Sequence, residues 1–228
     1  VSTFDVTRRL EHGLTSDRSS YDQVIYEYEH RDKDTPLFLF NVTIQNHGGY
    51  EDEDYKTTVE IEEAPGEFPQ AEQYLSLTKK SDEALEYLID YFSQQEDPVV
   101  ILFFGDHWPN LESEFLTMLL GEDSESLSFE NTMREYEVPF LIWANYDLEG
   151  EEVEAVSLNY LSGLLLRAAG LEGTDYTNYL ENLRDTLPVI TAMGVMDYEG
   201  NWYRNGEATP YDDLLNEYNI LEYNNAFG

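Results

Sequence analysis

The chain carries the segment PVVILFFGDHWPN at residues 98–110, and this segment decides the class of fold that the sequence predicts. Its first seven residues form the most hydrophobic run of the chain, which is typical of a strand covered on both faces. Gly105, Asp106 and His107 follow directly, where open α/β sheets bind their ligands. Because a carboxylate oxygen and an imidazole nitrogen suit zinc, manganese or a similar ion, the pair predicts a metal site. For an isolated Asp-His dipeptide, the alternative is a polar turn after a strand.

A second histidine occupies a comparable place. The segment PLFLFNVTI at residues 36–44 reads as another buried strand, and it runs into QNHGGY at residues 45–50. The two glycines after His47 permit positive φ and a close approach of the backbone to a ligand. If the strands at 36–44 and 98–104 are parallel, as helices between them would require, both histidines emerge at one edge of the sheet. We therefore expect His47, Asp106 and His107 to share a pocket, with a backbone-bonded turn histidine as the alternative for His47.

The remaining periodicity predicts an α/β fold. Apolar residues recur at helical spacing in four segments, namely 17–29, 68–94, 158–168 and 176–186, and a break near Ser81 could divide the second. Two further segments, 111–120 and 128–136, show the spacing more weakly. A third buried strand is predicted at 138–144 and a short exposed strand at 55–61. The crossover from the strand at 37–44 to the strand at 99–104 makes a right-handed βαβ unit the default. We expect residues 1–187 to form a mainly parallel sheet flanked by helices, with 188–228 as a small α+β hairpin and helix subregion of the same domain.

Three segments together carry a family resemblance. The segment at 38–50, the FGDH at 104–107 and the PFLIWANY at 139–146 resemble the lipoteichoic acid synthase group. That group belongs to the sulfatase-like branch of the alkaline phosphatase superfamily. The SLNYL at 157–161 is similar to its tail region, and the similarity runs in order from about Gly13 almost to the carboxyl end. An Asp-His after an apolar strand is common to the superfamily, whereas the form NHGGY points to a narrower bacterial subgroup.

The resemblance implies specific roles. Members of the family hold a divalent metal with an acidic residue, a threonine nucleophile, and the adjacent Asp and His. By that match Asp106 and His107 are metal ligands, and His47 contacts the substrate phosphate. Trp108 and Asn46 are expected at the rim of the substrate site. Manganese is the expected metal, with zinc, calcium and magnesium as alternatives.

The same resemblance exposes a deficit. In the family, the acidic ligand and the threonine nucleophile lie well before the position that matches His47, and residues 1–36 contain no convincing match to either. Thr3, Thr7 and Thr15 are candidates by residue type only. We therefore expect the carboxyl-terminal half of a catalytic domain, inactive alone. Two protein ligands would bind a metal weakly, because zinc-type sites use three or four.

Composition bounds the partners. The 228 residues contain 48 acidic and 12 basic side chains, so the net charge is 12 − 48 = −36. This balance argues against nucleic-acid binding, which needs Lys and Arg to neutralise phosphates. The chain has no cysteine and no apolar run long enough to span a bilayer. Relatives are anchored by upstream transmembrane helices, so the resemblance implies the outer face of a bacterial cell membrane, reached through segments missing from this chain.

Two functions of different classes remain open. The first is part of a metal-dependent phosphoglycerol transferase, or of a sulfatase-like hydrolase, acting on cell-envelope phosphodiesters. Its substrate would be the anionic head group of a phospholipid or glycolipid. The second is a non-catalytic module that keeps the fold and binds an envelope glycan or a protein. Fold alone does not choose between phosphate and sulfate esters.

Overall fold

The computed structural model describes residues 5–228. These residues form two units, and the chain passes between the units more than once. The first unit holds the described residues up to Glu96 together with Gly105–Pro139, and the second holds Asp97–Phe104 and Phe140–Gly228. The elements of the first unit are β1 (Leu10–Glu11), β2 (Leu14–Thr15), α1 (Asp17–His30), α2 (Pro69–Ser93), α3 (Ser113–Leu120) and α4 (Phe129–Arg134). The elements of the second unit are β3 (Val100–Phe104), β4 (Phe140–Ala144), a 3-10 turn η1 (Leu158–Tyr160), α5 (Leu161–Ala168), α6 (Asp175–Arg184), β5 (Val189–Ile190), β6 (Gly194–Met196), β7 (Trp202–Arg204) and α7 (Asp212–Phe227).

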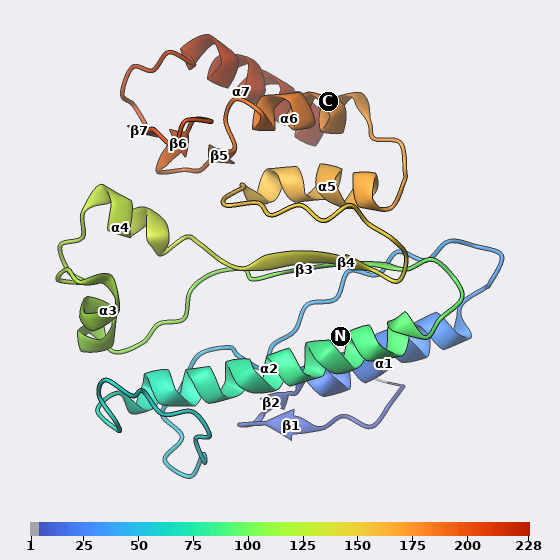
Figure 1. Cartoon of the computed structure of the whole chain (residues 1–228), viewed down its shortest axis with the longest axis vertical. Coiled ribbons are helices and arrows are strands. Elements are labelled where there is room, and N and C mark those ends of the chain that lie inside the picture. Colours follow the sequence, from blue (N-terminus) through green and yellow to red (C-terminus); the bar gives the residue numbers. More distant parts are fainter. Residues whose placement is uncertain (1–4) are drawn as a thin grey trace. The chain divides into compact units, whose positions relative to one another are not determined.

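Two helices, α1 and α2, pack side by side in the first unit (Figure 1). Helix α1 starts where Ser16 accepts a hydrogen bond from the Ser19 amide, and it buries Tyr21 and Ile25 one turn apart. Helix α2 runs unbroken for 25 residues, so the predicted alternative of a break near Ser81 is not observed. A core cluster on and beside the amino-terminal half of α2 comprises Tyr50, Ile61, Ala64, Ala71, Leu77, Leu111 and Phe115.

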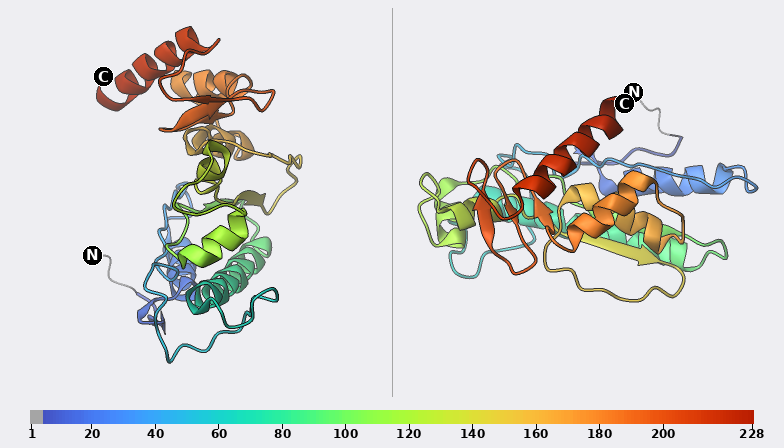
Figure 2. Two further views of the ribbon diagram at one scale, coloured as in Figure 1. Left: turned by 90° about the vertical axis from the view of Figure 1, so that its left-hand side faces the viewer. Right: turned by 90° about the horizontal axis from the view of Figure 1, so that it is seen from above.

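The second unit is built around β3 and β4. These strands pair over five residues, with Leu102 opposite Ile142, and helix α5 contacts both. A separate three-stranded sheet, in the order β5-β6-β7, lies against α7 (Figure 2). The core between α6, this sheet and α7 contains Tyr160, Leu180, Leu183, Leu187, Val195 and Tyr218. The hairpin expected within residues 188–228 is observed, because β6 and β7 pair antiparallel on either side of a turn at 198–199. The assignment of 1–187 and 188–228 to one domain stays a prediction.

The α/β class of the fold is confirmed, but the predicted strand direction is wrong. Strands β3 and β4 are antiparallel, as is every other strand pair in residues 5–228. The expectation rested on the helices between the strands. An apolar run shows that a strand is covered and does not show which way its partner runs. Here α3 and α4 lie within a connection that brings the chain back beside β3 in the opposite direction.

The segment Leu37–Ile44 is the second correction. It was predicted as a buried strand, yet it belongs to no strand, and Phe38, Phe40 and Val42 are 77%, 71% and 73% exposed. A strand exists only where a neighbouring backbone completes its ladder, and none of the strands in the described part of the chain pairs with this segment. The predicted strand at 55–61 is also absent, and the amides of Thr58 and Val59 bond instead to the hydroxyl of Ser76.

Candidate active site

The turn that carries the predicted metal ligands begins at Gly105, where there is little room for a side chain. The Gly105 amide donates to the Pro139 carbonyl at 3.0 Å. A Cβ atom at position 105 would lie 3.0 Å from the Cβ of Val138, which is closer than ordinary contact. Gly105 therefore lets the backbone that leads into Asp106 lie directly against the chain at 138–139.

Asp106 and His107 present a donor pair to solvent. Their side chains are 84% and 76% exposed, and His107 Nε2 lies 3.5 Å from Asp106 Oδ2. Oδ1 of Asp106 accepts from the His107 amide at 2.9 Å, which fixes the carboxylate against its own turn. His107 Nδ1 lies 2.8 Å from the Trp108 carbonyl oxygen. Because a carbonyl only accepts, Nδ1 carries a proton, so in the neutral form of the ring the free lone pair is on Nε2, beside the carboxylate.

This donor pair fits a divalent ion in part. Two ligands of one ion, each bonded at about 2.1 Å, lie about 3.4 Å apart at a tetrahedral angle, which is close to the observed separation. The other polar atom of each side chain is also bonded: Asp106 Oδ1 to the His107 amide, and His107 Nδ1 to the Trp108 carbonyl. Such bonds orient the ligands of a metal site. Among residues 5–228, however, no group of three or more His, Cys, Asp or Glu side chains is placed to hold an ion. The turn offers two ligands of the three or four that a site needs.

Trp108 is fixed beside this pair. Its indole Nε1 donates to the Glu137 carbonyl at 2.5 Å, and the ring is half-buried. The turn is thus tied at Gly105 and again at Trp108 to the segment that precedes β4. The predicted place of Trp108 at a substrate rim stays a prediction.

His47 lies at the surface on a turn of its own. Its amide donates to the Ile44 carbonyl at 3.0 Å, and its side chain is exposed. Gly49 then adopts φ +101°, a conformation that L side chains rarely adopt, and delivers Tyr50 into the core at 4% exposure. The sequence pattern NHGGY is therefore explained locally as a turn between an exposed segment and a buried aromatic.

Tyr50 connects the two parts of the predicted site. Its hydroxyl donates to the Asn46 carbonyl at 2.5 Å, next to His47. Burial raises the pKa of Tyr50 to about 12, with further contributions from Tyr74 and from the negative charge of Asp106. The Asp106 carboxylate is therefore near enough to act on a hydroxyl that bonds the His47 turn. The charge of Asp106 thus acts through space on Tyr50, and the two motifs are not related by a shared edge of parallel strands.

Sequence reasoning placed Asn46 at the substrate rim but missed the contacts that hold the His47 turn. Asn46 donates through Nδ2 to the Ser81 hydroxyl at 2.9 Å, so its side chain is engaged with α2. Gln45, only 2% exposed, bonds Asp17 and Ser81. His12 Nε2 lies 2.6 Å from the Gln45 carbonyl oxygen. Asp17 and Ser81 lie on helices α1 and α2, and a sequence does not distinguish such buried polar positions from solvent-facing ones.

Glu112, the cap residue of α3, links the segment that follows the metal turn to α2. The amino terminus of α2 has Phe68 as its cap residue, which offers no side-chain acceptor, and Pro69 as its first residue. The two oxygens of Glu112 supply the missing acceptors, at 2.7 Å from the Gln70 amide and 3.1 Å from the Ala71 amide. A carboxylate at this position also complements the positive end of the helix dipole.

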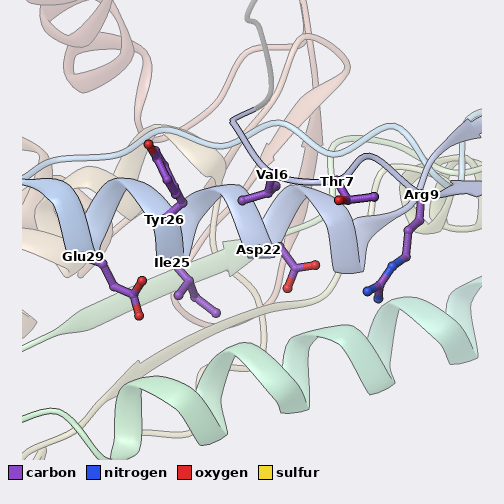
Figure 3. Close-up of a pocket in the computed structure, with 7 residues that line it drawn as sticks. All are labelled: Val6, Thr7, Arg9, Asp22, Ile25, Tyr26 and Glu29. Atoms are coloured by element: carbon purple, nitrogen blue, oxygen red, sulfur yellow. The ribbon is translucent and has the colours of Figure 1, made fainter.

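A cavity elsewhere in the first unit does not belong to this site. It has a volume of about 300 Å³ and lies between the segment before β1 and helix α1 (Figure 3). Its lining residues are Val6, Thr7, Arg9, Asp22, Ile25, Tyr26 and Glu29, none of which is a predicted site residue. Of the threonines considered by type, Thr7 lines this cavity, Thr15 lies in β2, and Thr3 falls outside the described residues.

This chain is similar to a protein family and to two curated bacterial proteins. The family model described as Sulfatase matches residues 3–171. A Rhizobium meliloti (strain 1021) protein to which cyclic beta-1,2-glucan modification is ascribed is 27% identical over 94% of this chain. The capsular polysaccharide biosynthesis protein RkpI of the same strain is 31% identical over 50% of the chain. The chain spans 34% and 19% of the lengths of these relatives.

A solved structure shares the fold. The Streptococcus pyogenes phosphoglycerol transferase GacH, in complex with sn-glycerol-1-phosphate, matches with a TM-score of 0.66 and 17% identity. The match covers 96% of this chain and 51% of that one. Among residues 5–228, none of the helices combines the length and the apolar character that crossing a bilayer requires.

Proposed function

Because this chain belongs to the sulfatase family, we propose that it forms the carboxyl-terminal part of a metal-dependent catalytic domain acting on phosphoglycerol groups of the cell envelope. The observation that carries the proposal is the pair of Asp106 Oδ2 and His107 Nε2, 3.5 Å apart and open to solvent. The hydrogen bond from His107 Nδ1 to the Trp108 carbonyl keeps the free lone pair on the nitrogen beside the carboxylate.

Each residue of the site has a distinct role in this proposal. Asp106 and His107 hold a divalent ion, manganese in the first instance, which when bound neutralises phosphoryl charge and lowers the pKa of a coordinated hydroxyl. His47 donates a hydrogen bond to a phosphate oxygen, and this bond is strongest when the imidazole is charged. Trp108 and Asn46 border the substrate. In this proposal the nucleophilic threonine and the third ligand are supplied by the amino-terminal half of the catalytic domain, which is not represented in these 228 residues.

The proposed substrate is a phosphoglycerol ester on an envelope glycan or on an anionic lipid head group. The names of the relatives concern glucan modification and capsular polysaccharide, and GacH is a phosphoglycerol transferase. A chain with a net charge of −36 repels such an anion at long range. Local positive charge from the ion and from His47 is therefore needed to admit it. Acting on such substrates would place the domain at the outer face of a bacterial membrane.

Binding of Mn²⁺ tests the ligand assignment directly. We expect Mn²⁺ to broaden the NMR signals of Asp106, His107 and their neighbours through its unpaired electrons, with weak affinity because only two ligands are present. His107→Ala should remove the local broadening. His30→Ala is the matched control, since His30 is an exposed histidine on α1 that bonds only the Tyr26 carbonyl and stacks on the Tyr26 ring. Equal broadening in wild type and His107→Ala would refute the assignment.

Turnover tests the proposed reaction. We expect negligible phosphodiesterase activity from the 228-residue chain and activity only in a protein that also carries the nucleophile. In that longer protein, His107→Ala should abolish turnover. Glycan binding that needs neither the metal nor His107, without any turnover, would instead favour the non-catalytic binding module.

A further inference from the structure

We propose that Asp17 and Ser81 are positioning residues that fix the turn carrying His47, an inference that rests on the proposed function for the use it assigns to His47. The two residues lie on different helices, α1 and α2, and are separated by 64 positions in the chain. Neither touches the proposed substrate. They act through Gln45 and Asn46, which immediately precede His47.

The hydroxyl of Ser81 joins the helices to the turn. It donates to Asp17 Oδ2 at 2.5 Å and accepts from Asn46 Nδ2 at 2.9 Å and Gln45 Nε2 at 3.0 Å. A hydroxyl has one proton and two lone pairs, so this one is fully used. An ionised carboxylate can only accept, so it draws the hydroxyl proton to itself and leaves both lone pairs for the amides. The carboxylate thus sets the direction of every bond in the network.

Gln45 is clamped from several sides. Its Oε1 accepts from the Asp17 amide at 3.1 Å, and its Nε2 also reaches the Leu77 carbonyl at 3.2 Å. The side chain is buried at 2% exposure, so water does not replace these partners. Both helices therefore hold the residue two positions before His47. Packed helices move less than loops, which suits them to support a binding residue.

Asp17 itself is an unusual residue to bury. It is 3% exposed, and burial raises the pKa of its carboxyl above the ordinary value, opposed by hydrogen bonds from Ser81, Gln45 and Thr43. Burying a carboxylate disfavours the fold unless its bonds compensate. Ser16 already caps the start of α1, so the cap does not itself require the carboxylate of Asp17. Its Oδ2 accepts from Ser81 and its amide donates to Gln45, whereas its buried Oδ1 accepts no hydrogen bond, so the bonds that it makes lead to Ser81 and to the turn.

Ser76 offers a matched control on the same helix. It is fully buried, and its hydroxyl also accepts two hydrogen bonds, from the Thr58 and Val59 amides. It holds a different segment of the first unit and has no bond to the His47 turn. Ser76→Ala and Ser81→Ala thus remove the same chemical group from α2 with comparable burial of partners.

Hydrogen exchange at the His47 amide measures the position of the turn without any ligand. This amide bonds the Ile44 carbonyl, so it is protected while the turn is held. After correction for any change in global stability, we expect Ser81→Ala to speed its exchange by about tenfold, the effect of losing one or two hydrogen bonds. Asn46→Ala, at a half-buried position, should act in the same direction. Ser81→Thr should restore protection because it keeps the hydroxyl, and Ser76→Ala should leave the amide within about twofold of wild type.

Titration with sn-glycerol-1-phosphate, followed by the His47 ring proton signals, tests the link to binding. We expect Ser81→Ala to weaken this response by about tenfold and Ser76→Ala to leave it unchanged. If the wild-type ring does not respond at all, the proposed function fails, while the exchange data still decide the positioning role. The positioning role is overturned if Ser81→Ala leaves His47 exchange unchanged, or if Ser76→Ala accelerates it equally.

Discussion

Removing the carboxylate of Glu112 should destabilise the amino terminus of α2 and its link to the start of α3. Its two oxygens accept from the Gln70 and Ala71 amides, and Phe68 and Pro69 provide no substitute. Ala71 is fully buried, so Glu112→Ala leaves a buried donor without an acceptor, at a cost of about 1–3 kcal/mol. Loss of a negative charge at a helix amino terminus adds about 0.3–1 kcal/mol. We expect a total loss of about 1–4 kcal/mol in the free energy of unfolding.

Urea unfolding followed by circular dichroism measures this loss. Glu112→Gln should cost about half as much, because the amide keeps one oxygen acceptor but loses the charge. Glu114→Ala is the matched control, since Glu114 is exposed and its carboxylate bonds only the neighbouring Ser113, and as an acidic residue in the first turn of α3 it should cost at most about 1 kcal/mol. A loss for Glu112→Ala no larger than that of Glu114→Ala would show that the carboxylate does not cap α2.

Three further outcomes follow from the packing and the charges. Gly105→Ala should cost about 1–3 kcal/mol, because its Cβ would meet Val138, and Val138→Ala in the same chain should recover most of that loss in urea unfolding. Leu187→Ala should cost about 2–5 kcal/mol, because Leu187 is fully buried in the core of the second unit, and an unchanged melting midpoint would contradict this. Because burial raises the pKa of Asp17, the folded chain holds that proton more tightly than the unfolded chain, and the stabilisation is lost as pH rises from about 4 through the folded pKa. Unfolding free energies measured across that range should therefore fall in wild type relative to Asp17→Asn, which cannot ionise, and a constant difference would refute the burial argument.

The sequence predicted helices well because the signal for a helix is local. Tyr21 and Ile25 lie one turn apart and are buried on α1, as their spacing indicated. The apolar positions of α2 behave in the same way. The antiparallel pairing of β3 with β4 was not predictable from either run, since strand direction depends on residues 36 or more positions apart. Residues 36–44 have the composition of a strand, but composition does not supply a partner.

The same difference between local and long-range contacts explains which parts of the candidate site the sequence predicted. The turn at Asp106 and His107 was found because Gly-Asp-His follows an apolar run, and all its defining contacts are between neighbours or with the segment at 137–139. The support of the His47 turn was missed because it comes from Asp17 and Ser81, on separate helices. Polar residues at such positions match the pattern of a solvated helix face. Their role becomes visible only when the helices are packed.

The bare apolar segment Leu37–Ile44 also bears on how the isolated polypeptide behaves at high concentration. A segment that pairs with none of the described strands and exposes Phe38, Phe40 and Val42 is a template on which a second molecule can add a strand. Mutual repulsion between molecules of charge −36 opposes that pairing, and dissolved ions screen the repulsion beyond about 8 Å at physiological ionic strength. Dilute buffer should therefore keep the polypeptide dispersed, whereas added salt should drive it toward intermolecular sheets and precipitation.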